Sequence, residues 1–283
     1  MPSPPHEPKT VLITGCGGGI GLATAMAAHR RGHRVFATMR DLGRRPAALD
    51  TGVETLALDV TDPESVRDCV ESVLKATDGR VDALVNNAGT ASAGFFEDTS
   101  DAEFRRVLDT NFHGALNVTR AVLPAMRARR AGRVILVSSV IALNAQATLS
   151  AYAASKWALE GWAEALAIEL APFGIETALV QPGAYRTAIF DSAPTFTQPD
   201  SPYSELFAST EARFREAIGQ SARDPQEAGA RIAALVDSRR PPFRTRLGPD
   251  ARIGHLVAQL PARTRHRLLR RLIGFPARAN PER

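Results

Sequence analysis

Short apolar runs alternate with longer amphipathic segments along most of this sequence, and this order restricts the fold more than any other feature. Most of the runs are continuously apolar, which is typical of strands that helices cover on both faces. A repeated strand–helix–strand order predicts a parallel sheet in one doubly wound α/β domain. Six runs are candidate strands: residues 10–15, 34–39, 54–60, 82–89, 133–139 and 175–183.

The intervals between these runs carry helix signals. Two of them open with an Asp-Pro pair, Asp62-Pro63 and Asp224-Pro225, which is the pattern of an N-cap followed by proline in the first turn. The expected helices cover residues 20–31, 62–77, 101–130, 151–171 and 224–237.

The stretch 188–222 breaks this alternation. It holds three prolines among Ser, Thr and aromatic residues, followed by an expected helix near 203–218. An irregular insertion of this length typically covers a functional site. Because it follows the sixth strand, it emerges at the carboxyl edge of the sheet, where such folds bind ligands. We therefore predict a lid.

The composition excludes several other classes of protein. The 283 residues are 44% hydrophobic and 23% charged, as in ordinary globular chains. The polar, proline-rich N-terminus is no secretory signal, and no stretch reaches the roughly 18 apolar residues that a membrane span needs. Two cysteines make no disulfide framework, and the six histidines show no metal-ligand spacing, so we expect a cytoplasmic protein without a metal site.

A glycine cluster, TGCGGGIG (residues 14–21), follows the first strand. Gly15, Gly19 and Gly21 allow a tight turn into a helix and a close approach to a pyrophosphate, and Gly17 is an additional glycine. A close helix–strand crossing would also explain such glycines. Their place between an apolar strand and an amphipathic helix favours a dinucleotide site.

The end of the second strand carries the cofactor signal. Arg40 favours NADP, since an arginine there suits a 2′-phosphate, whereas Asp41 would suit the ribose hydroxyl of NAD if the register shifts by one or two residues. The other interpretation is an exposed polar strand end. We predict NADP, with NAD as the alternative.

The stretch YAASK places Tyr152 and Lys156 four residues apart, which is one face of a helix. A free tyrosine has a pKa of about 10, and a nearby cation lowers it toward the range of a working acid or base. The pair therefore fits proton transfer to or from an alcohol or carbonyl oxygen. Taken alone, it would more often be an ordinary surface pair. Ser139, or its neighbour Ser138, ends an apolar strand and would reach the same sheet edge.

The order and spacing of these motifs resemble the short-chain dehydrogenases/reductases over roughly residues 9–240. The matching features are TGCGGGIG, Asp59, NNAG (86–89), Asn111, Ser139, YAASK and PGAYRT (182–187). The stretches ATMRDL (37–42), EGW after the lysine and PGAYRT are most similar to the branch that holds the hydroxysteroid and retinol dehydrogenases. Such a resemblance implies a Rossmann-like fold and an enzyme that acts on CH–OH donors with NAD(P).

The resemblance also implies roles for individual residues. Tyr152 would be the proton donor or acceptor, and Lys156 would lower its pKa and bind the nicotinamide ribose. Ser139, 13 residues before the tyrosine, would bind the substrate oxygen, and Asn111 would hold a water. Besides Tyr152 and Lys156, the implied cofactor contacts are Gly15, Gly17, Gly19, Ile20, Gly21, Arg40, Asp59, Val60, Asn87, Ala88, Gly89, Pro182, Gly183 and Thr187.

The expected substrate is a hydrophobic alcohol or ketone, steroid-like, retinoid-like, long-chain or aromatic. Aromatic and aliphatic residues gather in the loops that would surround Tyr152; the alternative interpretation is that half of them only pack the lid. They are Phe95, Phe96, Leu143, Tyr185, Ile189, Phe190, Phe196, Tyr203 and Phe207. The alternative function is a dinucleotide-sensing regulator that keeps the fold and catalyses nothing.

The C-terminal part differs from the rest in charge. The net charge is +5, and residues 240–283 hold 11 arginines against 2 acids. Residues 263–274 fit a basic amphipathic helix, which we interpret first as docked on the domain and second as a peripheral membrane contact. The segment has no aromatic residues between its arginines that would stack on the bases of a nucleic acid, so we expect no nucleic-acid partner.

We divide the chain into a disordered segment (1–8), a dinucleotide-binding catalytic domain (9–250) and a basic extension (251–283). The resemblance implies a homodimer or homotetramer.

Overall fold

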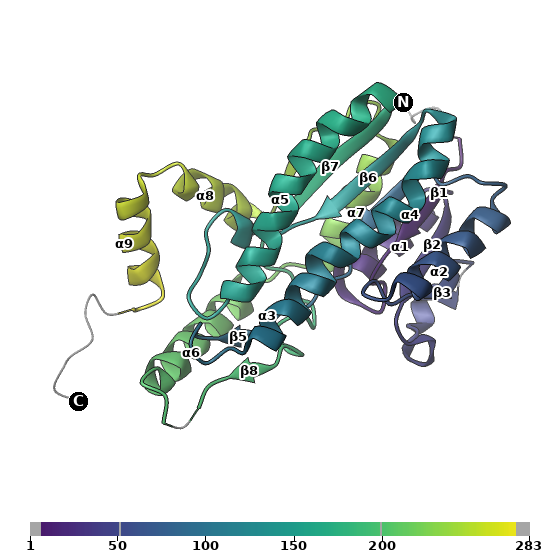
Figure 1. Cartoon of the computed structure of the whole chain (residues 1–283). Coiled ribbons are helices and arrows are strands. Elements are labelled where there is room, and N and C mark those ends of the chain that lie inside the picture. Colours follow the sequence, from purple (N-terminus) through teal and green to yellow (C-terminus); the bar gives the residue numbers. More distant parts are fainter. Residues whose placement is uncertain (1–6, 51, 199, 276–283) are drawn as a thin grey trace.

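The computed structural model describes residues 7–50, 52–198 and 200–275, which form a parallel sheet with helices on both faces (Figure 1). The strand order is β3-β2-β1-β4-β6-β7-β9, and every neighbouring pair is parallel. This confirms the predicted doubly wound fold. The strands are β1 (Thr10–Ile13), β2 (Arg34–Met39), β3 (Glu54–Ala57), β4 (Ala83–Asn86), β6 (Gly132–Val137), β7 (Ile175–Pro182) and β9 (Arg244–Leu247).

The helices pack in two layers because successive strand residues face opposite sides of the sheet. The helices are α1 (Gly19–Arg30), α2 (Pro63–Ala76), α3 (Asp101–Leu108), α4 (Gly114–Arg129), α5 (Ser150–Leu170), α6 (Ser204–Ser221), α7 (Pro225–Asp237), α8 (Pro249–Ala258) and α9 (Ala262–Leu272). In β1, Val11 and Ile13 belong to the core under α1 and α7, whereas Leu12 belongs to the core under α2, α4 and α5.

The two Asp-Pro starts form as predicted. The Asp62 carboxylate accepts a hydrogen bond from the Glu64 backbone N–H, and the Asp224 carboxylate accepts one from that of Gln226. Both caps satisfy a backbone donor that the helix itself leaves unpaired.

The expected helix over 101–130 is interrupted. A π-helical turn, η3 (Asp109–His113), joins α3 to α4, and such turns frequently occur at functional sites. An inserted residue leaves the apolar periodicity of the flanking helices almost unchanged, so no pattern in the sequence signals it.

Two further features were not predicted. β9 reads RTRL and only Leu247 is buried, so it lacks an apolar run, yet it pairs with β7 as an edge strand. The segment predicted as a lid is held by a second small sheet, in which β5 (Ala93–Gly94) pairs with β8 (Thr195–Phe196). Strands of two residues are too short to show a period.

The C-terminal helices α8 and α9 extend away from the sheet on the side of α6 (Figure 1). The predicted boundary between residues 250 and 251 falls inside α8, and the predicted helix at 263–274 corresponds to α9. Most of the segment predicted as disordered, and the end of the basic extension, lie outside the described residues. Among the helices that the structure describes, none is long and apolar enough to span a membrane.

Candidate active site

The chain reverses its direction of winding at β1, since β2 and β4 flank this strand on opposite sides. Open parallel sheets bind ligands at the carboxyl ends of the strands beside such a point. The glycine cluster directly follows β1, and the NNAG segment begins with the last residue of β4. Both motifs therefore meet at this edge of the sheet.

Ser139, Tyr152 and Lys156 converge from two elements. Ser139 follows β6 and caps a short 3-10 helix, η4 (Val140–Ala142), through a hydrogen bond from the Ile141 N–H to its Oγ (3.2 Å). Tyr152 lies in the first turn of α5 and hydrogen-bonds the Ser139 side chain, and Lys156 follows one turn later. Ser138, the alternative serine, is buried and makes no contact with the tyrosine among the described interactions.

Burial controls the titration of both α5 residues. Tyr152 is 5% exposed, and desolvation raises its pKa to about 12, against a smaller lowering by the Ser139 hydrogen bond. Lys156 is 3% exposed, and desolvation lowers its pKa to about 8, with Glu160 opposing the shift. The lysine Nζ donates to the Val137 carbonyl at 2.9 Å and lies 5.8 Å from the Tyr152 ring centroid. Its lowering of the tyrosine pKa therefore remains a prediction.

Asn111 occupies the π-helical turn and is 1% exposed. Its Oδ1 accepts from the Thr90 N–H (2.7 Å), and its Nδ2 donates to the Thr90 carbonyl (2.9 Å) and to Ser155 Oγ (2.9 Å). The amide thus bonds to other segments rather than to its own helix, and it ties the loop after β4 to α5. A Cβ on Gly89 would lie 3.4 Å from this Oδ1 and 3.7 Å from the Lys156 Nζ, so the three residues form one cluster.

The glycine loop is packed against the NNAG segment. Gly15 has φ +74°, and a Cβ there would lie 2.7 Å from the Ala88 Cα. A Cβ on Gly21 would lie 2.3 Å from the Gly15 carbonyl oxygen and 2.4 Å from the Asn87 Nδ2. This Nδ2 donates to the carbonyls of Thr14 and Gly15. The glycines are required here because backbone and amide occupy the space of a side chain.

Two hydroxyls of this framework were missed by the sequence analysis. Thr14 Oγ1 accepts from the N–H groups of Asn87 (3.0 Å) and Ala88 (2.9 Å), and Ser155 Oγ joins Asn111 to the Tyr152 carbonyl. Both belong to motifs that were recognised, TGCGGGIG and YAASK. A polar residue at a strand end or inside an Ala-rich helix was the available signal.

The PGAYRT segment closes the other side of the loop. A Cβ on Gly19 would lie 2.9 Å from Thr187 Cγ2, and Pro182 is buried at the end of β7. A Cβ on Gly183 would lie 2.0 Å from the carboxylate of Asp250, a residue outside the predicted site. Residues 15–21, 86–89 and 182–187 therefore line one cradle.

This cradle fits a dinucleotide. α1 begins at Gly19, so its first N–H groups lack helical partners and carry partial positive charge that suits a pyrophosphate. A Cβ on Gly18 would meet nothing within 4 Å, so the loop faces open space on its outer side. Ile20, in contrast, packs its side chain against the core under α1.

The polar residues at the ends of β2 and β3 differ in whether they already have hydrogen-bond or ion-pair partners. Asp41 Oδ1 accepts from the Gly43 N–H (2.8 Å) and its Oδ2 lies 3.6 Å from Arg44, so this carboxylate holds a turn. Asp59 Oδ1 likewise accepts from the N–H and hydroxyl of Thr61. Val60 is buried, and its carbonyl accepts from Asn117 Nδ2. Arg40 is exposed and lines an open cavity of about 610 Å³ whose wall also includes Thr61 and Arg105.

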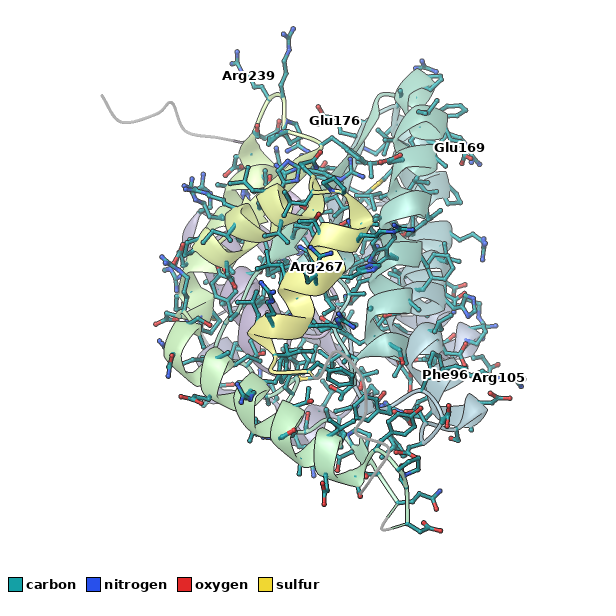
Figure 2. All side chains as sticks on the ribbon, turned by 90° about the vertical axis from the view of Figure 1, so that its left-hand side faces the viewer. Phe96, Arg105, Glu169, Glu176, Arg239 and Arg267 are labelled. Carbon is teal, nitrogen blue, oxygen red and sulfur yellow. The ribbon has the colours of Figure 1, made fainter. Side chains whose placement is uncertain are left out.

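An apolar cluster covers Tyr152. The Phe190 ring stands edge-on to the tyrosine ring, with 5.7 Å between centroids. Five of the nine predicted lining residues belong to this cluster, namely Phe95, Ile189, Phe190, Tyr203 and Phe207. Phe96 instead is 71% exposed (Figure 2), and Tyr185 packs in the core under α1 and α7.

Among the described residues, no cluster of His, Cys, Asp and Glu is placed to bind a metal.

Comparisons with known proteins agree with this geometry. A model of the short chain dehydrogenase family matches residues 9–197. Retinol dehydrogenase 8 of Homo sapiens is 38% identical over 288 residues, covering 93% of this chain and 90% of that protein. A 3-ketodihydrosphingosine reductase of Bacteroides thetaiotaomicron is 37% identical over 245 residues, covering 86% and 89%. A short-chain dehydrogenase structure from Streptomyces avermitilis, 38% identical, matches with a TM-score of 0.77 over 89% of this chain and 92% of the other.

Proposed function

The chain belongs to the short-chain dehydrogenase family, and on that premise we propose that it interconverts a hydrophobic secondary alcohol and its ketone, or an alcohol and its aldehyde, with NADP(H). Members of this family are oxidoreductases that use a nicotinamide dinucleotide. The observation that carries the proposal is the convergence of Ser139, Tyr152 and Lys156 beneath an apolar cover, beside the dinucleotide cradle.

The residues divide the work as follows. The nicotinamide supplies or accepts the hydride. Ser139 and Tyr152 hold the substrate oxygen by hydrogen bonds, and the Tyr152 hydroxyl gives its proton to that oxygen during reduction or receives one during oxidation. Lys156, whose Nζ donates to the Val137 carbonyl, would bind the cofactor ribose and act on the tyrosine as a cation. Asn111 is held by Thr90 and Ser155, and it fixes the position of the loop after β4 beside this lysine.

The proposed preference for NADP rests on a difference between Asp41, which has hydrogen-bond partners, and its neighbour Arg40, which has no ion-pair partner among the described residues. Asp41 already accepts hydrogen bonds from its own turn, which leaves it poorly placed for a ribose hydroxyl. Arg40 is exposed, and within the described part of the chain no carboxylate lies within ion-pairing distance of it. A free guanidinium suits a 2′-phosphate, since it forms charge-assisted hydrogen bonds with phosphate oxygens.

The substrate is proposed to be hydrophobic because apolar side chains surround Tyr152. Two relatives point the same way, since one is named for retinol, an alcohol, and the other for 3-ketodihydrosphingosine, a ketone. Phe190 packs on the catalytic tyrosine, so a substrate must displace this ring to reach it.

A homodimer or homotetramer through α4 and α5 is also proposed. On the outer face of α5, Trp157 is 51% exposed and Ile168 is 76% exposed. These two residues are eleven positions apart, which is three helical turns, so they lie on one face. A second copy of the chain that covers this face would remove both side chains from water.

The test is oxidation of NADPH, with NADH in parallel, across a panel of hydrophobic ketones and aldehydes. We expect turnover with NADPH that Tyr152→Phe lowers by about 10²-fold or more, because the proton donor is lost. Cofactor binding, followed by fluorescence, serves as the control and should weaken far less than turnover falls, since Tyr152 is only one of the cofactor contacts that the resemblance implies. Tight cofactor binding without turnover of any carbonyl would instead favour the non-catalytic sensor.

A further inference from the structure

The C-terminal helix α9 forms one wall of an open cavity of about 640 Å³, and residues 145–147 form the opposite wall. This volume is within the range of sites for small organic ligands. The segment 145–147 lies in the loop that leads into α5 and Tyr152. One wall of the cavity is therefore only a few residues before Tyr152 in the sequence, although no sequence motif predicts a cavity there.

One side of the cavity is cationic. Arg263, Arg267 and Arg270 line it together with His266, and their spacing of three to four residues places them on one face of α9. All four side chains are exposed. Figure 2 labels Arg267 on α9.

These arginines have no counterion in the part of the chain that the structure describes. No carboxylate among residues 7–50, 52–198 and 200–275 forms an ion pair with Arg263, Arg267 or Arg270, and the cavity lining contains no Asp or Glu. Guanidinium groups bind carboxylate and phosphate oxygens through paired N–H donors. An anion would therefore suit this wall of the cavity.

The other side of the cavity is apolar and continuous with the cover of Tyr152. Ala147 and Phe275 line the cavity, and both also pack against the cluster that holds Tyr152. The Phe275 ring lies 5.9 Å from that of Phe95, and Phe95 stacks on the lid residue Tyr203 at 4.7 Å. The remaining apolar lining residues are Ala145, Leu269, Leu272 and Ile273.

We propose that this cavity binds the charged end of an anionic amphiphile whose carbonyl or alcohol carbon reaches Tyr152. The charged end is a carboxylate or phosphate held by Arg263, Arg267 and Arg270, and the apolar part enters through Phe275 and Ala147. This inference rests on the proposed function and names the class of its substrate. In reduction, an ω-oxo acid, NADPH and one proton give the ω-hydroxy acid and NADP⁺.

The apolar residues of α9 are only partly covered. Leu269 and Ile273 are half-buried against the cavity wall, whereas Leu272 is 67% exposed. A helix that lies on a membrane also uses exposed apolar residues beside its basic face, but the adjoining cavity of about 640 Å³ favours a small amphiphile. Peripheral membrane contact, the second interpretation of the basic extension, therefore becomes an outcome that the experiment must separate.

The test compares ω-oxo acids of 8, 12 and 16 carbons with their methyl esters, which differ only in the charged end. We expect kcat/KM for the acid of best length to exceed that of its ester by about tenfold or more, since one charge-assisted hydrogen bond is sufficient for that factor. The double variant Arg267→Gln/Arg270→Gln should remove the preference and leave ester turnover within about twofold. Arg239→Gln, an exposed arginine far from α9 in Figure 2, is the matched control.

Equal turnover of acid and ester by the wild type would overturn the proposal, as would an equal loss of both substrates in the double variant. A second measurement does not depend on catalysis. Calorimetric binding of dodecanoate should be weakened about tenfold or more in the double variant and unchanged in Arg239→Gln.

The two hypotheses fail in different ways. Dodecanoate binding without turnover of any carbonyl contradicts the proposed function and leaves the anion site in place. Turnover of the esters without dodecanoate binding contradicts the anion site alone. Arginine-dependent sedimentation with phosphatidylglycerol vesicles, without discrimination between acid and ester, would assign α9 to a membrane surface and overturn the proposal.

Discussion

The carboxylate of Asp250 accepts a hydrogen bond from the backbone N–H of Ala184 at 2.5 Å, which joins the first turn of α8 to the PGAYRT segment. Its other oxygen is buried against Gly183, where a Cβ would lie 2.0 Å away. The segment that would hold the nicotinamide end of the cofactor is thus positioned by a residue 66 positions further along the chain.

Loss of this contact should loosen the cofactor segment. We expect Asp250→Ala to raise KM for NADPH by about 5- to 20-fold, because a charge-assisted hydrogen bond is lost, while kcat changes less than about threefold. Asp250→Asn keeps one oxygen acceptor and should recover part of the loss. Steady-state kinetics with a saturating carbonyl substrate checks both variants, and a fall in kcat at unchanged KM would contradict this positioning role.

Burial of the Lys156 ammonium predicts a pH-dependent stability. Its pKa is lowered from 10.5 to about 8, so between these values the unfolded chain binds more protons than the folded one, and stability rises with pH. The wild type should therefore gain stability relative to Lys156→Met as pH increases from 8 to 10. Melting temperatures of the cofactor-free proteins measure this difference. Lys75→Met replaces an exposed lysine, so the difference in melting temperature between the wild type and this variant should not change with pH. If both variants gave the same pH dependence of melting temperature, the burial argument would be refuted.

The side chain of Arg40 should decide between the two cofactors. We expect Arg40→Ala to raise KM for NADPH about tenfold or more, since contacts with the phosphate are lost, and to leave KM for NADH within about twofold. Asp41→Asn is the matched neighbour and should leave both values nearly unchanged, because Asp41 serves its own turn. A larger effect of Asp41→Asn on NADH would show that the aspartate is the ribose ligand.

Two glycines of the loop should respond differently to one added methyl group. At Gly21 the methyl would lie 2.3 Å from the Gly15 carbonyl oxygen, so Gly21→Ala should cost about 1–3 kcal/mol of unfolding free energy through overpacking. At Gly18 the backbone is extended and a Cβ meets nothing within 4 Å, so Gly18→Ala should leave stability nearly unchanged. Urea unfolding of both variants makes the comparison, and equal losses would contradict the described loop packing.

Elements with a local signature were predictable from the sequence. Continuous apolar runs marked six strands, and the Asp-Pro pairs marked the starts of α2 and α7. The shape of the loop required glycine at 15 and 21, and Tyr152 and Lys156 are on one face of a helix whatever surrounds them. Each of these signals lies within a few consecutive residues, where backbone geometry and the spacing of side chains determine the local structure without contacts from distant segments.

Other features depend on contacts between distant segments. β9 is a strand because β7 offers an open edge, although RTRL has no apolar pattern of its own. Asn111 sits in a π-helical turn, where it reaches Thr90 and Ser155, and neither the turn nor its partners leave a trace in the local sequence.

The sequence by itself therefore determined the sheet and the form of the glycine loop, and it predicted the side chains that we propose to react, because these follow from local periodicity and from residue chemistry. Only the tertiary structure decided that Asp250 supports the PGAYRT segment, that burial dominates the titration of Tyr152 and Lys156, and that α9 places beside the apolar cover arginines with no counterion among the described residues. The physical reason is that desolvation and counterion pairing depend on all neighbours in space. Those neighbours are known only once the chain has folded.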